Sequence, residues 1–199
     1  MTIIIEDRAA VLDTIKLDHG KHGTFDQGHC AMEVVAWLAG EGHTDAPQCA
    51  SPVLRRFTIG LNDSWNAEQR QALIPFLPRM VGTAGDGKDI TRAFMLADWA
   101  CREVLPAMYD ALGKPDLAEQ LRVLEPVTNR ETALAAKDKS REIRKTYAAD
   151  AYAADADAAD AAAYAAYAAD AADAADADVR ETLRKSALEL LDRLIDPEA

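Results

Sequence analysis

Histidines and cysteines gather near the N-terminus of the chain. All four histidines and two of the three cysteines lie between residues 19 and 49: His19, His22, His29, Cys30, His43 and Cys49. Imidazole nitrogens and thiolates are ligands that zinc prefers, so Cys30, Cys49 and one or two histidines, such as His22 and His43, are candidate zinc ligands. Their spacing matches no zinc finger or ribbon, and the sequence has neither a CxxC nor an HExxH motif. The alternative is a set of loop histidines around a pair of buried thiols.

A second candidate is Glu33, which lies in an otherwise apolar stretch, HCAMEVVAWLA, at residues 29–39. A carboxylate among Met, Val and Trp side chains is costly to bury unless it is paired, hydrogen-bonded, metal-bound or protonated. One interpretation is a structural ion pair with an arginine of the core. The other is a functional group, either an acid with a raised pKa or a carboxylate that orients a ligand.

The segment 90–105 carries residues that suit a flat, anionic ligand. At helical spacing one side of this segment presents a carboxylate, an indole ring and two guanidinium groups: Asp98, Trp99, Arg92 and Arg102. Guanidinium groups bind phosphate and an indole ring stacks on a base, so these residues are candidate ligand contacts together with Glu33 and Arg79. The alternative is a solvated helix face on which Asp98 and Arg102 form an ordinary i, i+4 pair.

Helices must position these residues, because nothing after Ile5 alternates apolar and polar residues as a strand would. Helices are predicted over residues 6–17, over 29–39 up to Gly40, after Ser51–Pro52, after Asn66 with Gln69, over 90–105 and from Pro115. The core face of the helix over 90–105 is predicted to consist of Ile90, Ala93, Phe94, Ala97, Cys101 and Val104.

Residues 148–178 contain only alanine, aspartate and tyrosine, in numbers of twenty, eight and three. Alanine is the best helix former, and no Gly or Pro interrupts the chain between Pro126 and Pro197. We therefore expect an all-α protein with a compact helical N-terminal domain over residues 1–128, which holds the Cys, His and Glu motif. Long Ala- and Asp-rich helices follow over residues 129–199. They are expected to pack back on that domain or on a partner subunit, which makes a homo-oligomer possible.

The net charge of −12 argues against binding to nucleic acid, which needs clustered positive charge. The one basic concentration is diluted by acids and is either a solvated helix face or a docking patch: Arg130, Lys137, Lys139, Arg141, Arg144 and Lys145. The sequence shows no signal-peptide core and no stretch that approaches a transmembrane span. An odd number of cysteines without an export signal favours reduced thiols in the cytoplasm.

Several motifs together resemble an alanine-rich helical family of actinobacteria and their phages, some members of which are labelled immunity proteins. The resemblance rests on HGTFDQGHCAMEVVAWLAGEGHTDAPQCASPVL (22–54), LIPFLPRMVGT (73–83), RAFMLADWACR (92–102) and the alanine-rich tail ending in LELLDRLI (188–195). It covers most of residues 22–195 and brings no catalytic residues with it. It implies a small soluble effector encoded by a phage or another mobile element.

Three hypotheses about function follow. The first is a binding protein that captures a small anionic, nucleotide-like ligand to counter host defence, with no cofactor. The second is an immunity-type protein that binds a protein toxin. The third is a metal-dependent hydrolase that uses the Cys, His and acid segment, with zinc as the metal. The absence of a recognised catalytic spacing favours binding over catalysis.

Overall fold

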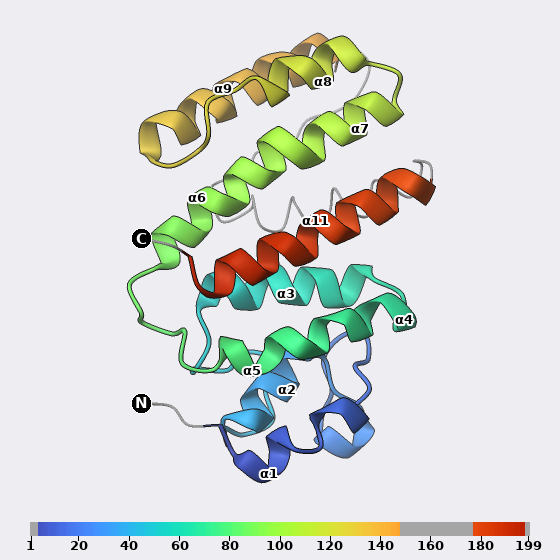
Figure 1. Ribbon diagram of the computed structural model, residues 1–199, viewed down its shortest axis with the longest axis vertical. Helices are drawn as coiled ribbons and strands as arrows, with labels where there is room; N and C mark the ends of the chain where they lie inside the picture. The colour runs from blue at the N-terminus through green and yellow to red at the C-terminus, as the bar shows by residue number, and fades with distance from the viewer. Residues whose placement is uncertain (1–3, 148–176, 198–199) are drawn as a thin grey trace. The chain divides into compact units, whose positions relative to one another are not determined.

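The computed structural model describes residues 4–147 and 177–197, and within these ranges every regular element is a helix (Figure 1). The prediction of an all-α protein is therefore confirmed for this part of the chain. None of the helices in the described ranges is long and apolar enough to cross a membrane. The alanine-rich run at residues 148–176 lies outside the described residues, and with it the prediction that this run packs back on the N-terminal domain or on a partner subunit.

The chain forms two compact units. The first unit comprises residues 1–89 and 191–199, and the second comprises residues 90–190. The domain boundary predicted from the sequence, at residue 128, stays a prediction. It falls inside the second unit, between α8 (Pro115–Arg122) and α9 (Arg130–Tyr147).

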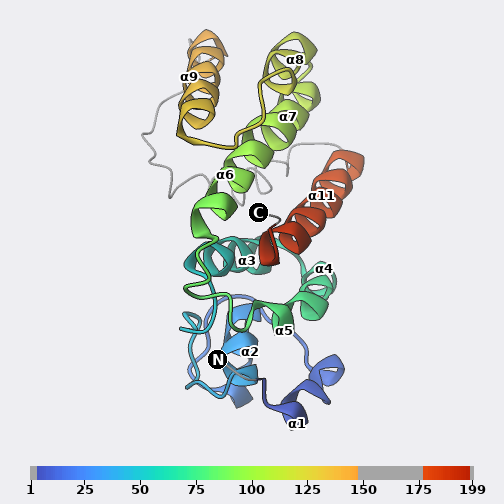
Figure 2. The same cartoon turned by 60° about the vertical axis from the view of Figure 1, so that its left-hand side comes forward.

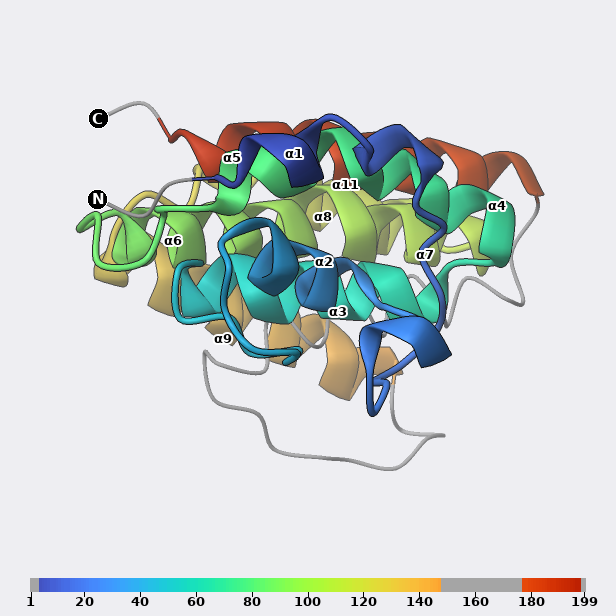
Figure 3. The same ribbon diagram turned by 90° about the horizontal axis from the view of Figure 1, so that it is seen from below.

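The first unit is built around α2 (Ala31–Leu38), which packs against α3 (Pro52–Ser64) and α5 (Leu77–Met80) (Figure 3). The helix predicted over residues 6–17 is reduced to α1 (Glu6–Ala9) and a 3₁₀ turn at Leu12–Thr14. Two more 3₁₀ turns occur, at Phe25–Gln27 and at Gln71–Phe76, and the second of these follows α4 (Ala67–Arg70). The segment between the turn at Leu12–Thr14 and α2 contains little regular structure. Hydrogen bonds with side chains hold most of it in place.

Helix α2 is buried on nearly every side, as its apolar sequence predicted. Every residue from Ala31 to Leu38 except Trp37 is buried, and the helix ends before Gly40, whose φ of +74° favours glycine. A helix without a solvated face leaves a polar side chain no access to water. Glu33 must therefore find its partners inside the protein.

Local capping signals set the starts of the next two helices. The Ser51 hydroxyl accepts hydrogen bonds from the amides of Val53 and Leu54, and Pro52 opens α3. Asn66 and Gln69 form a reciprocal capping box at the start of α4. Both starts were predicted from the sequence and are confirmed.

The second unit contains α6 (Asp89–Trp99) from Ile90 onwards, a π turn at Ala100–Val104, α7 (Leu105–Ala111), α8, α9 and most of α11 (Ala177–Ile195). Helices α7 and α8 form a hairpin, and α9 runs beside them (Figure 2). Their shared core consists of Tyr109, Ala118, Leu121 and Ile143. In the turn between α7 and α8, Gly113 has a φ of +69°.

The core face predicted for residues 90–105 is wrong along α6, and of its six residues only Val104 is buried. Ile90 is 71% exposed, whereas Arg92, Leu96 and Trp99 are buried. A continuous α-helix would extend this buried stripe to Glu103, but Glu103 is exposed and Val104 is buried instead. The π turn inserts one residue into the helical repeat, so a stripe drawn backwards from Val104 at α-helical spacing falls on the wrong side of α6.

Candidate functional site

The most completely built polar site of the first unit surrounds Glu33, in the first turn of α2. Its carboxylate is fully buried and accepts the backbone amide of Cys30 at 2.8 Å, which forms half of a capping box. The carboxylate therefore lies at the positive end of the helix dipole. This position favours the ionised form of the side chain.

Two histidines from the flanking loops complete the site. His22 donates its backbone amide to Glu33 Oε1 at 2.8 Å, and its Nδ1 lies 3.0 Å from Oε2. His43 Nε2 lies 3.2 Å from Oε1 and 3.1 Å from the carbonyl oxygen of His22. One carboxylate thereby holds α2, the loop at residue 22 and the loop at residue 43 together.

The hydrogen bond to Glu33 fixes how His22 presents its ring. With Nδ1–H facing the carboxylate, the neutral imidazole carries its lone pair on Nε2, which lies 3.8 Å from Asp18 Oδ2. Gly28 leaves room for the ring, because a Cβ at this position would lie 2.6 Å from His22 Cδ2. The His22 side chain is 13% exposed, so only a small part of the ring reaches solvent.

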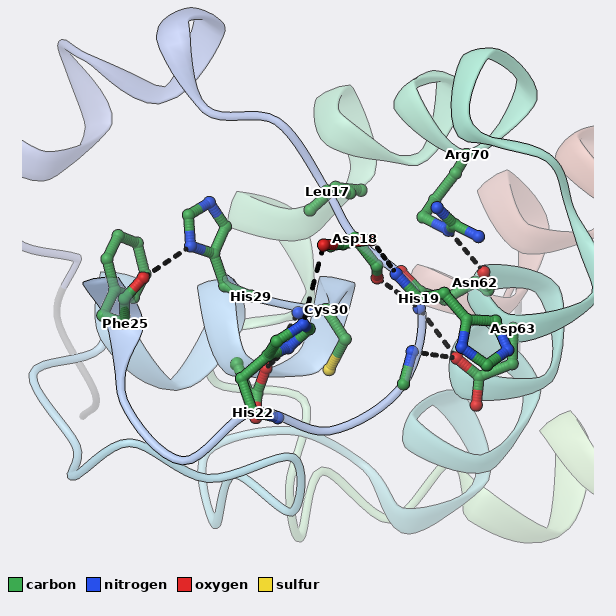
Figure 4. Close-up of polar contacts among 12 residues, drawn as sticks. Leu17, Asp18, His19, His22, Phe25, His29, Cys30, Asn62, Asp63 and Arg70 are labelled. Carbon is green, nitrogen blue, oxygen red and sulfur yellow. Dashed lines mark hydrogen bonds and ion pairs between the residues drawn. The ribbon is translucent and has the colours of Figure 1, made fainter. Parts of the chain in front are cut away.

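A buried amide, Asn62 of α3, positions the loop that carries the histidines. Its Oδ1 accepts the amide of Ala31 at 3.1 Å, and its Nδ2 donates to the carbonyl oxygen of Asp18 at 3.0 Å. The amide of Asp18 donates in turn to the carbonyl oxygen of His29 at 2.9 Å (Figure 4). Asn62 therefore fixes both ends of the segment from residue 18 to residue 31.

The electrostatics of Glu33 contradict two of the expectations from the sequence, and a carboxylate that orients a ligand stays a prediction. Burial raises the pKa of Glu33, but hydrogen bonds from the amides of His22 and Cys30 and from the His22 ring outweigh it and leave the pKa below its usual value. The prediction of an acid with a raised pKa is therefore wrong. The predicted arginine partner is also wrong, because the groups that contact the carboxylate are histidines and backbone amides.

The cysteines of this region are free thiols. Cys30 and Cys49 are both buried, and burial raises the pKa of each thiol to about 12. A thiol in this environment stays protonated at neutral pH and is a poor nucleophile. The described ranges contain no group of three or more His, Cys, Asp or Glu residues able to hold a metal ion. A zinc site that uses His22, Cys30, His43 or Cys49 stays a prediction.

Four of the six predicted ligand contacts lie in the second unit, on α6 and the π turn: Arg92, Asp98, Trp99 and Arg102. Arg92 is fully buried. Trp99 is 2% exposed, and its indole N–H donates to Ser186 Oγ of α11 at 2.7 Å. Asp98 Oδ1 lies 3.6 Å from Arg102 Nε and accepts the amide of Val127 at 2.8 Å. The indole face is therefore covered by protein, and the i, i+4 pair of Asp98 and Arg102 is present.

The other two predicted contacts, Glu33 and Arg79, belong to the first unit. Arg79 pairs with Asp192, near the end of α11. The six residues thus form no single site within either unit.

A cavity that the sequence did not predict lies between α7, α8 and α9 in the second unit. Its volume is about 170 Å³, and its apolar wall consists of Leu105, Met108, Tyr109, Leu112 and Leu121. The polar part of the lining comes from Ser140 and Arg144, one turn apart on α9. Apolar pockets with a few polar groups are the usual form of small-molecule sites.

Arg144 has no ion pair or hydrogen bond with any residue that the structure describes, and its side chain is exposed. From the sequence, Arg144 was identified only as one member of a basic cluster. A sharper signal was available, because Ser140 lies on the same stripe of α9 as the buried residues Ala136 and Ile143. A hydroxyl group on a buried stripe, one turn before an arginine, indicates a place where polar side chains line an otherwise apolar cavity.

Comparisons with known proteins add no family to this description: no family model, no curated protein and no solved structure matches the chain.

Proposed function

We propose that the protein binds a small anionic molecule in the cavity between α7, α8 and α9. One observation carries the proposal. Arg144 lines an apolar cavity and has no acidic partner among the described residues. A guanidinium group beside an apolar wall gains a charge-assisted hydrogen bond when an anion enters. Ser140 lies on the same wall, and its hydroxyl donates a hydrogen bond to Cys101 Sγ at 3.7 Å, so Arg144 is the group on which anion binding depends.

The proposal keeps the class of ligand that the sequence suggested and changes its place. The contacts predicted on α6 include Arg92 and Trp99, which are buried, whereas Arg144 is exposed beside an open space. A nucleotide-like ligand and a role against host defence stay predictions. So does the origin in a phage or mobile element that the family resemblance implies.

A thermal-shift experiment on the full chain tests the proposal. A panel of inorganic phosphate, AMP and small carboxylates is added at millimolar concentration. A ligand at about 100 times its Kd stabilises the native protein by about 2.7 kcal/mol, which raises the melting temperature. We expect at least one anion to do so, and Arg144→Gln to remove the rise. Arg141→Gln is the matched control, because Arg141 is exposed on the same helix and does not line the cavity.

Two outcomes would refute the proposal. In one, no anion of the panel shifts the melting temperature of the unmodified protein. In the other, the two arginine variants lose the shift equally, because the effect would then come from general surface charge. In either case an immunity-type protein partner, the second hypothesis from the sequence, becomes the leading one.

A hydrolase is the second candidate, and the hydrogen bond between Glu33 and His22 Nδ1 favours it. A carboxylate in this place orients an imidazole so that its other nitrogen can accept a proton or bind a metal. Hydrolysis of nitrophenyl esters and phosphates, measured with and without added zinc, would test it. Activity lost in His22→Gln and kept in His19→Gln would support the hydrolase, since His19 is exposed and its ring has no contact with Glu33. Equal rates in both variants would count against it.

A further inference from the structure

We infer that the ligand of the cavity is a monocarboxylate with a compact apolar body of about the size of benzene. The inference rests on the proposed function and names the class of anion. It follows from three properties of the site: the volume of the cavity, the number of its charges and the chemistry of its wall.

Volume limits the body of the ligand. The cavity measures about 170 Å³. An apolar cavity of about 150 Å³ holds one benzene molecule, so a body of about six carbon atoms fits the space. A whole nucleotide, with its base, sugar and phosphate, is several times larger than benzene. Only one part of it would enter.

Charge limits the head of the ligand. The lining contains one cation, Arg144, and two residues with a hydroxyl group, Ser140 and Tyr109. A guanidinium group matches a carboxylate in plane and in charge, with two parallel N–H···O hydrogen bonds. A phosphate ester with two negative charges would need further cations. The protein as a whole, at a net charge of −12, opposes its approach.

The wall favours carbon over further polar groups. Four of the seven lining residues are Leu or Met side chains of α7, its C-terminal cap and α8: Leu105, Met108, Leu112 and Leu121. Methionine adapts to irregular shapes, and the ring of Tyr109 suits an edge or stacked contact with an aromatic body. Benzoate and hexanoate both meet the three requirements.

Isothermal titration calorimetry on the full chain tests this inference, with benzoate, hexanoate, acetate, hexanol and AMP as probes. Benzoate and hexanoate should bind. Each CH₂ group buried adds about 0.8 kcal/mol, so affinity should rise about fourfold per CH₂ from acetate to hexanoate. Hexanol should bind about tenfold more weakly than hexanoate, because it lacks the charged hydrogen bonds to Arg144.

Variants locate the two parts of the ligand. Arg144→Gln should bring hexanoate down to the affinity of hexanol, while Arg141→Gln should leave the difference intact. Leu112→Trp should abolish the binding of hexanoate and of hexanol. Leu112 lies at the exposed edge of the cavity, and the larger tryptophan ring would fill the space. Since Leu112 is 49% exposed, this variant should keep its fold.

The outcomes separate the inference from the proposed function. If AMP binds through Arg144 and the carboxylates do not, the ligand class is wrong and anion binding stands. If hexanol binds as tightly as hexanoate, the site does not select an anion, and both the inferred ligand class and the proposed function are wrong. Both also fail if no anion binds to the unmodified protein. Nuclear Overhauser effects between benzoate and the methyl groups of Leu105 or Leu121 would confirm the cavity as the place of binding, and their absence from a bound complex would refute it.

Discussion

The polar centres of the two units differ in how many of their hydrogen bonds the protein itself supplies. The Glu33 carboxylate has two backbone amides and two imidazole rings against it and no exposure to solvent. Arg144 has no partner among the described residues and faces a cavity. A polar group that the fold has already satisfied has little to offer a ligand. A charged group beside an apolar cavity gains free energy when an anionic ligand arrives.

Under the proposed function, the first centre stabilises the fold and the second binds the ligand. Substitutions at Glu33 should therefore change the free energy of unfolding, whereas substitutions at Arg144 should change ligand affinity. Four predictions test that division, from the largest expected effect to the smallest.

Glu33→Ala should destabilise the protein most. The change leaves the amides of Cys30 and His22 and two imidazole rings without their acceptor, and each buried donor left unsatisfied costs about 1–3 kcal/mol. Chemical denaturation measures the loss. Glu68→Ala is the control, since Glu68 is exposed and should cost less than about 0.5 kcal/mol. Similar losses in the two variants would show that the Glu33 site does not hold the first unit together.

Gly28→Ala should destabilise by about 1–3 kcal/mol. The residue has a φ of +132°, and an added Cβ would lie 2.6 Å from the His22 ring, so the backbone or the ring must move. Gly42→Ala is the matched control, because a Cβ at residue 42 meets no atom within 4 Å. If the two variants are equally stable, His22 is not fixed in the position that Glu33 gives it.

Features decided by neighbouring residues could be predicted from the sequence, whereas contacts between residues far apart in the sequence could not. The caps at Ser51 and Asn66 were predicted correctly because each is decided within a few neighbouring residues. Glu33 was recognised as a buried carboxylate, but its partners come from loops at residues 22 and 43, which no local pattern connects to α2. The cavity was missed because three separate helices form its wall.

Acid should remove the contribution of Glu33 to stability. The folded pKa of Glu33 lies below its ordinary value of 4.5, so the native state binds its proton less readily than the unfolded chain does. The contribution is therefore fully present above pH 4.5 and is lost as the pH falls through the folded pKa. The unfolding free energy of the unmodified protein should fall more steeply on acidification than that of Glu33→Gln. Parallel curves would contradict an ionised Glu33.

Arg144→Gln should change the stability of the ligand-free protein least, by less than about 0.5 kcal/mol, because its exposed side chain has no partner to lose among the residues that the structure describes. Denaturation without added anions measures this value. A loss above about 1 kcal/mol would mean that Arg144 supports the fold, and would weaken the assignment of binding to the second centre.

The most direct test of this assignment is to follow the side-chain Nε–Hε resonances of Arg144 and Arg141 by nuclear magnetic resonance while benzoate is added to the full chain. We expect the Arg144 signal to shift and to saturate with the same Kd that calorimetry gives, while the Arg141 signal stays in place. Benzyl alcohol, which has the same ring without the charge, should leave both signals nearly unchanged. If benzoate shifts neither signal, or shifts both without saturation, the second unit does not bind an anion at Arg144.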